Sequence, residues 1–342
     1  MSASWRFLLS GCLFISAAGW AEVAPGSVQS GSLARRDGSE ARYYILHQQA
    51  EPTRKLLVLM QGSDCNSAKN NRFMVDTFGG AFADHDILLV EKYGITDALA
   101  YDNGEGERED CPVETMFNDT LSVRVSDYTA VLNRLTGDYD SVVVLGGSKG
   151  ATVAEHVGLA SPVVSAVVAV NGGGRYFLDD VTYSFRCGPA PLAENDITGF
   201  VEFTDAVKKN EVPGDLLVSQ HGVRWWREFL AVDTQQVLND QKKPVLVIQT
   251  LNDTNVNVPS FKQMQKEVVD PQVTFKTFDN LDHYFKDEQG QRQTTQILMT
   301  IRDWYDGLYP EDVGHIKQTP VKTGVESGIA GNQRTTRTEV CA

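Results

Sequence analysis

The sequence predicts an α/β protein with a mostly parallel central sheet, helices on both faces of that sheet and a small helical cap. Short β-rich runs alternate with segments of helical periodicity along most of the chain. Most of these runs are continuously apolar, which is typical of parallel strands covered by helices on both sides. One long segment, about 175–240, interrupts the alternation and is expected to form the cap. The alternation itself indicates a single α/β domain.

The expected strands are rich in Val, Leu and Ile. They are Arg42–His47, Leu56–Met60, Ile87–Glu91, Ser141–Leu145, Val164–Val170, Val245–Gln249 and Val273–Phe278. Apolar residues from Leu121 to Leu135 recur at steps of three and four, which predicts an amphipathic helix that Gly137 ends. A last long helix is expected to stop before Pro310.

Residues 1–21 have the layout of a secretory signal peptide. One charge, Arg6, precedes an apolar run that ends in small residues, and cleavage is expected after Ala21. The segment is short for a membrane span, so no stable membrane insertion is expected after cleavage. The protein is therefore expected to be exported, into a periplasm or out of the cell. A lipid anchor through Cys12, in the lipobox-like run from Leu9, is the alternative.

The rest of the chain divides by composition. Residues 22–40 are rich in Gly, Ser and Ala and are expected to form an irregular lead-in. Residues 41–310 are expected to form the main domain, with the cap inserted at about 175–240. Residues 311–342 are polar and lack apolar periodicity, which is typical of an extended tail.

The charge of the chain argues against two classes of partner. The formal net charge is −14, and no run of Lys or Arg occurs. Nucleic acids and anionic membranes attract proteins through clustered basic residues. No nucleic-acid partner is therefore expected.

Four cysteines follow the expected leader, an even number in a compartment that permits disulfides. None has the paired C-x-x-C spacing of a zinc or redox site, so no metal is expected. The four are Cys65, Cys111, Cys187 and Cys341. The sequence by itself does not choose among their three possible pairings.

The strongest candidate for a reactive group is Ser148. The apolar run up to Leu145 leads directly into Gly-Gly-Ser-Lys-Gly and then into a helix. A serine in G-x-S-x-G between a strand and a helix stands on a strained turn above the sheet edge, and the flanking glycines keep strand and helix from clashing. The alternative is a glycine-rich turn that carries a solvated serine.

A serine hydroxyl becomes a good nucleophile only beside a base. Of the six histidines, His283 alone directly follows a late strand, on a loop at the edge of the sheet where Ser148 emerges. Asp253 follows another buried strand and is the expected carboxylate that orients the histidine. Asp279 and Asp282 are rivals, but they lie so near His283 in the sequence that the loop would have to contort. The order Ser, Asp, His agrees with this assignment.

A tetrahedral oxyanion also needs two N–H donors. The expected donors are the backbone N–H groups of Lys149, after the nucleophile, and Ser63, in the loop after an earlier strand. In the cap, Trp225 and Trp226 are candidates for the apolar wall of a substrate pocket, and the alternative is that they anchor the cap.

Together these residues resemble the α/β-hydrolase superfamily, and the resemblance runs from about Arg42 to Pro310. The elbow around Ser148, the acid Asp253 and the base His283 match its positions one by one. The elbow Gly-Gly-Ser-Lys-Gly-Ala is similar to those of dienelactone-hydrolase-like and prolyl-oligopeptidase-like enzymes and of acyl-thioesterases. The resemblance implies a sheet of about eight strands, a cap inserted after the strand that follows the elbow helix, no metal and no organic cofactor.

The sequence departs from the family pattern at two positions. Gln61-Gly62 stands where His-Gly is usual, and Thr250 stands where a glycine is frequent before the acid loop. Neither change removes a catalytic group, but both leave the substrate class open.

The resemblance implies a serine hydrolase, and a carboxylic-ester hydrolase that forms an acyl-enzyme on Ser148 is favoured, with a small-molecule ester as substrate. A serine peptidase or amidase of short peptides is one alternative, and a non-catalytic binding protein on the same fold is another. In this fold Cys65 and Cys111 follow neighbouring strands, so these two are expected to pair, and Cys187 and Cys341 pair or remain free. The acidic loop of Asp102 to Glu114 is expected to overhang the site and draw cationic substrates.

Overall fold

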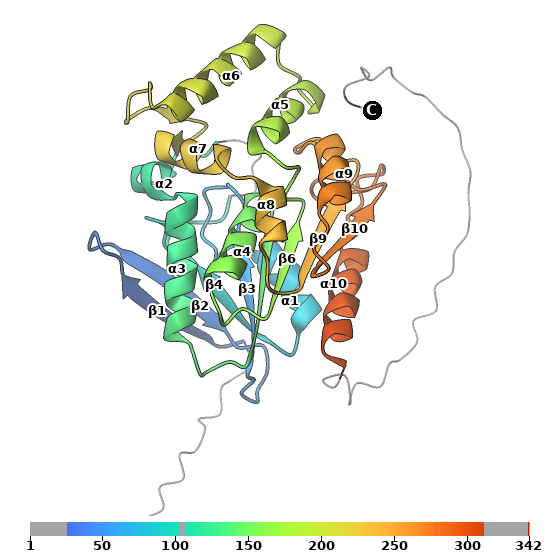
Figure 1. Cartoon of the computed structure of the whole chain (residues 1–342). Coiled ribbons are helices and arrows are strands. Elements are labelled where there is room, and N and C mark those ends of the chain that lie inside the picture. The colour runs from blue at the N-terminus through green and yellow to red at the C-terminus, as the bar shows by residue number, and fades with distance from the viewer. Residues whose placement is uncertain (1–25, 103–106, 311–340, 342) are drawn as a thin grey trace, which may run out of the picture.

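The computed structural model describes residues 26–102, 107–310 and 341, so the expected leader and nearly all of the expected tail lie outside the described residues. Eight strands form one sheet in the order β1-β2-β4-β3-β5-β6-β9-β10 (Figure 1). Only the β1–β2 and β2–β4 pairs are antiparallel. The strands are β1 Val28–Ala34, β2 Glu40–Leu46, β3 Lys55–Met60, β4 Asp86–Val90, β5 Ser141–Gly147, β6 Ala166–Val170, β9 Val245–Thr250 and β10 Val273–Phe278. The predicted mostly parallel sheet is confirmed.

One segment expected to be irregular contains a strand. β1 lies within residues 22–40 and pairs with β2, with Gly31 opposite Tyr43. Its side chains are mostly exposed, so the backbone ladder holds the strand rather than an apolar face, and periodicity could not reveal it. The Tyr43 ring lies over Gly31: a Cβ atom at that position would be 2.3 Å from it, so a larger residue would have to displace the ring.

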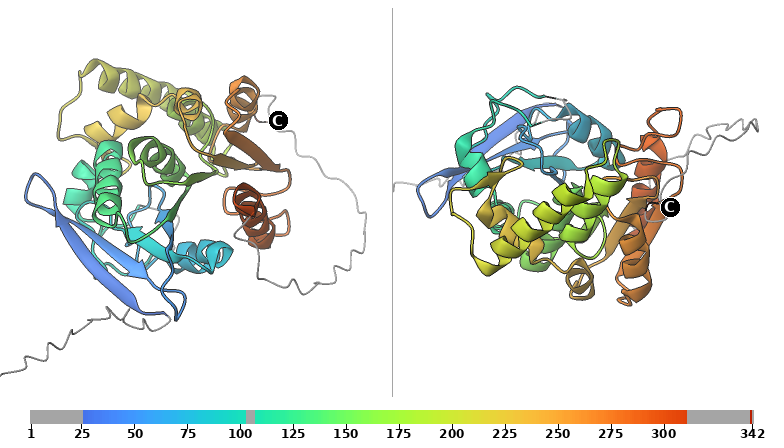
Figure 2. Two further views of the ribbon diagram at one scale, coloured as in Figure 1. Left: turned by 60° about the horizontal axis from the view of Figure 1, so that its bottom comes forward. Right: turned by 90° about the horizontal axis from the view of Figure 1, so that it is seen from above.

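Helices cover both faces of the sheet. Alternate side chains of a strand face opposite sides, so Leu56 and Val58 of β3 pack in the core beneath α3, α4, α8 and α9. Leu57 and Leu59 pack in the core beneath α1, η1 and α10. Figure 2 shows the helices on the two sides of the sheet. The bounds are α1 Arg72–Gly79, η1 Gly80–Phe82, α2 Val113–Asn118, α3 Leu121–Arg134, α4 Lys149–Ala160, α8 Thr234–Asn239, α9 Val258–Glu267 and α10 Thr294–Leu308.

The cap lies between β6 and α8 in the chain and above the carboxyl ends of the parallel strands, at the top of Figure 1. It consists of α5 Phe177–Cys187, α6 Glu194–Lys209, α7 Val223–Leu230 and a hairpin of β7 Leu217–Val218 and β8 His221–Gly222. Aromatic rings hold it together: Trp226 stacks on Phe177 at 5.8 Å between ring centroids. Within the described ranges, none of the helices has the length and apolarity needed to span a membrane.

The elbow helix α4 packs so closely on β3 that a methyl group has no space at Gly150. A Cβ atom there would lie 2.2 Å from the carbonyl oxygen of Met60. We expect Gly150→Ala to lower the free energy of unfolding by about 1–3 kcal/mol, as overpacking does in other cores. Denaturant unfolding with the disulfides intact measures this.

Gly199→Ala is the matched control, because a Cβ atom at Gly199, inside α6, would have no atom within 4 Å. Alanine is favoured over glycine in a helix, so this variant should be more stable by up to about 1 kcal/mol. If Gly150→Ala unfolds at the same denaturant concentration as the wild type, α4 does not pack on β3 as closely as the structure shows.

Candidate active site

Ser148 occupies a strained turn between β5 and α4. Its backbone has φ 54° and ψ −127°, in the left-handed region that costs a residue other than glycine of order 1–3 kcal/mol. The turn is tight because strand and helix nearly touch: a Cβ atom at Gly146 would lie 1.9 Å from the carbonyl oxygen of Gly150. The sequence therefore folds into the elbow that its glycines predict, with Ser148 at the top.

His283 and Asp253 form a buried hydrogen-bonded pair. His283 Nδ1 lies 2.7 Å from Asp253 Oδ2, and the Asp253 side chain is fully buried. Two further donors fix the carboxylate: Gln249 Nε2 donates to Oδ2 at 3.1 Å and the backbone N–H of Asn255 donates to Oδ1 at 2.8 Å. The carboxylate is therefore held in one orientation toward the imidazole ring.

The two rival carboxylates are placed elsewhere. Asp282 accepts the backbone N–H of Tyr284 at 2.8 Å and so closes the turn that carries His283. Asp279 is exposed. The structure thus pairs His283 with Asp253, from the neighbouring strand, rather than with a residue of its own loop.

The structure leaves one expected contact unformed. In the part of the chain that it describes, no hydrogen bond joins the Ser148 hydroxyl to His283. Serine and histidine lie on loops at the same edge of the sheet, after β5 and β10. In enzymes without substrate, hydrogen bonds between catalytic groups are often long and tighten when the substrate binds.

Asn171 positions the loop of His283 and was not among the residues predicted from the sequence. It follows β6 with a left-handed φ of 50°. Its Nδ2 donates to the His283 carbonyl at 3.0 Å, and its Oδ1 accepts the backbone N–H and the hydroxyl of Thr250 at 2.9 and 3.1 Å. The available signal was a polar residue directly after a buried strand at the catalytic edge.

The expected oxyanion loop lies beside Ser148. A Cβ atom on Gly62 would lie 3.4 Å from the Ser148 Cβ. The buried Arg124 donates to the carbonyl oxygens of Gln61 and Gly62 at 2.7 and 3.4 Å. A trans peptide directs its N–H opposite to its carbonyl, so the N–H of Ser63 faces away from Arg124.

Arg124, on α3, was not predicted either, because an arginine within an amphipathic helix gives no signal of such a role. Among the described residues, the backbone N–H groups of Ser63 and Lys149 have no hydrogen-bond acceptor. Both residues line the same cavity as Ser148. The two expected donors are therefore free to bind an oxygen atom there.

The cavity has a volume of about 500 Å³ and lies between the sheet edge and the cap. Trp225 and Trp226 both line it, and both are buried. Trp225 stacks on the His221 ring at 3.8 Å, while Trp226 Nε1 donates to the Val218 carbonyl at 3.0 Å. Each tryptophan therefore anchors the cap and forms part of the cavity wall.

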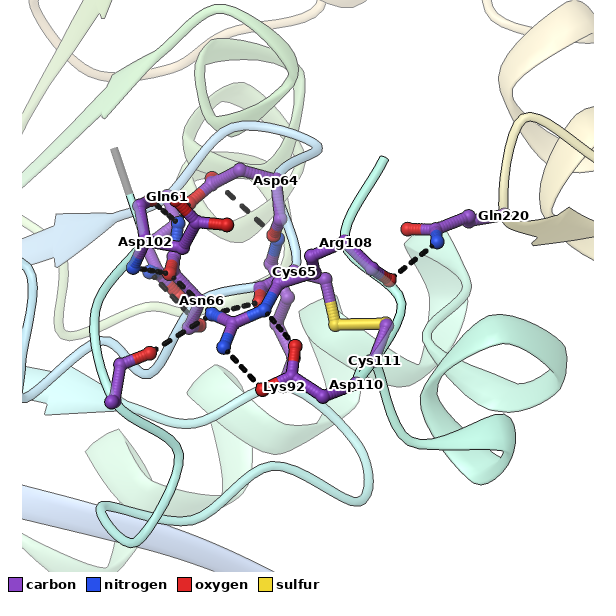
Figure 3. Close-up of a disulfide and its surroundings, with 11 residues drawn as sticks. Gln61, Asp64, Cys65, Asn66, Lys92, Asp102, Arg108, Asp110, Cys111 and Gln220 are labelled. Atoms are coloured by element: carbon purple, nitrogen blue, oxygen red, sulfur yellow. Dashed lines mark hydrogen bonds and ion pairs between the residues drawn. A yellow bond between two sulfur atoms is a disulfide. The ribbon is translucent and has the colours of Figure 1, made fainter. Parts of the chain in front are cut away.

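The Cys65–Cys111 disulfide forms another part of this wall, and it is the pairing expected from the sequence (Figure 3). Arg108 reinforces the bridge: its Nη1 donates to the Cys65 carbonyl at 3.2 Å and to Asn66 Oδ1 at 2.8 Å. Gln220, at the tip of the cap hairpin, donates to the Arg108 carbonyl at 2.7 Å. The expected oxyanion loop, the acidic loop and the cap are thereby joined.

The structure also joins Cys187, the last residue of α5, to Cys341. From the sequence, these two cysteines were expected either to pair with each other or to remain free. Within the described residues, no group of three or more His, Cys, Asp or Glu side chains is placed to hold a metal ion.

Comparison with known proteins gives the fold a name. No family model matches the sequence, and no curated protein matches it. The structure is similar to that of the alpha/beta hydrolase GrgF from Penicillium sp. sh18, with 11% identity, a TM-score of 0.55 and coverage of 82% of this chain and 98% of that one. The chain has the α/β-hydrolase fold.

Two further solved structures share the fold. One is a cold-adapted esterase from an Arctic intertidal metagenomic library, with 13% identity, a TM-score of 0.51 and coverage of 84% of this chain and 97% of that one. The other is the Pyrococcus horikoshii acylaminoacyl peptidase, with 13% identity, a TM-score of 0.52 and coverage of 83% of this chain and 42% of that one.

Buried charges surround the start of α4. Burial raises the pKa of Glu155 to about 8, and the nearby Lys149 ammonium opposes this shift. Burial likewise raises the pKa of Asp180 to about 6 and lowers the pKa of Lys149. Removing such groups from water disfavours their charged forms.

The raised pKa of Glu155 predicts a pH-dependent stability. Between the ordinary value of 4.5 and about 8, the folded chain binds a proton that the unfolded chain has lost, so the free energy of unfolding falls as pH rises through this window. We expect Glu155→Gln, which does not titrate, to become progressively more stable than the wild type from about pH 5 to about pH 8. Denaturant unfolding at several pH values tests this, with the exposed Glu202→Gln as control. A constant difference between Glu155→Gln and the wild type would contradict it.

The Cys65–Cys111 bridge predicts a loss of stability on its removal. It closes a loop with a sequence separation of 46 residues, and by the chain-entropy model we expect the Cys65→Ser, Cys111→Ser variant to lose about 4 kcal/mol of unfolding free energy. Thermal or denaturant unfolding measures the loss. An unchanged midpoint would mean that Arg108 and Asn66 hold the two loops without the bridge.

Proposed function

We propose that this protein is a serine hydrolase that forms an acyl-enzyme on Ser148. Among serine hydrolases, we favour a carboxylic-ester hydrolase. The observation that carries the proposal is the strained elbow serine at the same sheet edge as a buried hydrogen-bonded pair of His283 and Asp253. Strained backbone at a residue other than glycine persists where the surroundings enforce it, and such residues cluster at active sites.

The proposed reaction has two halves. In the first, Ser148 Oγ attacks the ester carbonyl carbon while His283 Nε2 takes its proton, and the N–H groups of Lys149 and Ser63 bind the oxyanion. His283 then gives the proton to the leaving alkoxide, which departs as the alcohol. In the second half, water attacks the acyl-enzyme with His283 again as base, which releases the acid and restores Ser148. Asp253 holds the imidazole ring and stabilises its protonated form.

The size of the cavity suits a small-molecule substrate. Its volume of about 500 Å³ lies in the range of small-molecule pockets, and the cap covers it. A peptidase or amidase would use the same groups, but an amine cannot leave until it is protonated, whereas an alkoxide is a better leaving group and depends less on the acid. We favour the ester for this reason, and the test below includes amide substrates.

We further propose that the protein is exported, because its two disulfides suit an oxidising compartment.

Fluorophosphonate labelling tests the proposal directly. The wild type should become labelled on Ser148 and should hydrolyse nitrophenyl esters, while Ser148→Ala should do neither and should still fold. Asp253→Asn should lower kcat by about 10⁴-fold, because the amide favours the wrong imidazole tautomer. Nitroanilides of the same acyl groups are tested in parallel, because an amidase would hydrolyse them and an esterase would not. Ester hydrolysis that survives Ser148→Ala would rule out the assignment, and a folded wild type that neither labels nor hydrolyses would indicate a binding protein.

A further inference from the structure

Lys149 carries a buried cation into the cavity directly beside the nucleophile. It is the first residue of α4, next to Ser148 in the chain. Only 7% of its surface is exposed, and it lines the cavity together with Ser148 and Phe177. Its ammonium nitrogen lies 3.9 Å from the centre of the Phe177 ring and 6.0 Å from that of Phe229.

This ammonium has no polar partner within the described ranges of the chain: no hydrogen bond or ion pair to it occurs there. An aromatic ring attracts a cation above its face. The cost of burying an unpaired charge is larger than this attraction, so the rings compensate for only part of the burial. A negatively charged group in the cavity would supply the missing partner.

Two buried acids, Asp180 and Glu155, attract Lys149, but among the described residues neither forms an ion pair with it. Asp180 lines the same cavity and attracts Lys149 at a distance, but the two form no ion pair. Its Oδ1 instead accepts the backbone N–H groups of Gly174 and Asn257, both at 2.9 Å. Asp180 is therefore committed to holding the chain at the start of α5 and before α9.

The other buried lysine of the cavity is already engaged. Lys92 donates a hydrogen bond to the Asp64 carbonyl, and its ammonium lies 3.9 Å from the Asp64 carboxylate. Of these two buried lysines, only Lys149 can offer all three of its N–H donors to a ligand.

The acidic loop acts from the exposed side of the cavity. Asp102 and Glu107 line it but are exposed, and solvent and salt screen exposed charges strongly. Lys149 is shielded from both by the protein around it. Close to the reacting bond, the buried cation should therefore outweigh the exposed carboxylates.

We propose that Lys149 binds a carboxylate of the substrate, so that the preferred substrates are esters that carry a carboxylate a few atoms from the scissile bond. This inference rests on the proposed serine hydrolase activity. Consecutive Cα atoms are about 3.8 Å apart, so the side chain of Lys149 starts close to the acylated oxygen. The backbone N–H of Lys149 would bind the oxyanion while its ammonium binds the carboxylate, and one residue would fix both ends of the acyl group.

Matched esters test the proposal. The comparison is nitrophenyl hemiglutarate against nitrophenyl valerate, which has a neutral acyl chain of similar length, and against a nitrophenyl ester with a quaternary ammonium on its acyl chain. Carboxyphenyl valerate places the carboxylate on the leaving group instead. We expect the wild type to have its highest kcat/KM on nitrophenyl hemiglutarate, because the proposal places the carboxylate on the acyl group. A higher kcat/KM on carboxyphenyl valerate would contradict this placement.

Lys149→Met should lower the ratio of kcat/KM for the carboxylate ester to that for nitrophenyl valerate by about tenfold or more, the scale of a charged hydrogen bond. The ratio cancels any general loss of activity in the variant. Lys149→Arg should restore part of the preference. Lys208→Met removes an equal charge from an exposed site on the cap and should leave the ratio unchanged.

Binding separates this inference from the proposed function. Ser148→Ala protein is titrated in a calorimeter with glutaric acid monoanilide, the amide analogue of the half-ester, and with the neutral valeranilide. Tighter binding of the acid, lost in the Ser148→Ala, Lys149→Met variant, supports the inference even if no ester is hydrolysed. Equal binding of both anilides, or a wild-type preference for neutral or cationic esters, would overturn it while leaving the hydrolase proposal standing.

Discussion

The site depends on how closely three pieces of backbone approach one another at the elbow. β5, α4 and the end of β3 meet where Gly146 and Gly150 have no space for a Cβ atom. Because the chain must reverse from strand to helix within this space, Ser148 is held in the left-handed region. The same approach brings the loop after β3 beside Ser148. One packing contact therefore sets both the exposed hydroxyl and the position of the candidate oxyanion donors.

Around this fixed point, the remaining groups are joined by hydrogen bonds between segments that are far apart in the sequence. Asn171 links the ends of β6 and β9 to the loop of His283. Arg124 reaches from α3 to the carbonyl groups of Gln61 and Gly62. Figure 3 shows the corresponding arrangement on the cavity wall, where Arg108 connects the loop of Cys65 to the cap hairpin. Burial strengthens such networks, because water competes less for each polar group.

The sequence predicted what depends on periodicity and on position after a strand. Seven of the eight strands in the main sheet were predicted, most of them as apolar runs. Asp253 could be paired with His283 because each follows a predicted strand, and the structure shows these two strands to be parallel neighbours. β1 could not be predicted, since its pairing needs only backbone groups. The position of Asn171 after a buried strand was a signal, but the roles of Asn171 and Arg124 could not be predicted, because they depend on partners 79 and 63 residues away. The residue pattern of one segment cannot predict contacts with segments that lie far away in the sequence.

The Cys187–Cys341 disulfide has a consequence for the integrity of the chain. It spans a sequence separation of 154 residues, and this covalent ring contains β9, β10 and the pair of Asp253 and His283. A protease that cuts the chain once inside the ring releases no fragment, since the bridge still connects the two pieces. After a single cut, the acid and the base therefore stay covalently attached to the half of the molecule that carries Ser148, and separating them requires reduction of the bridge or a second cut.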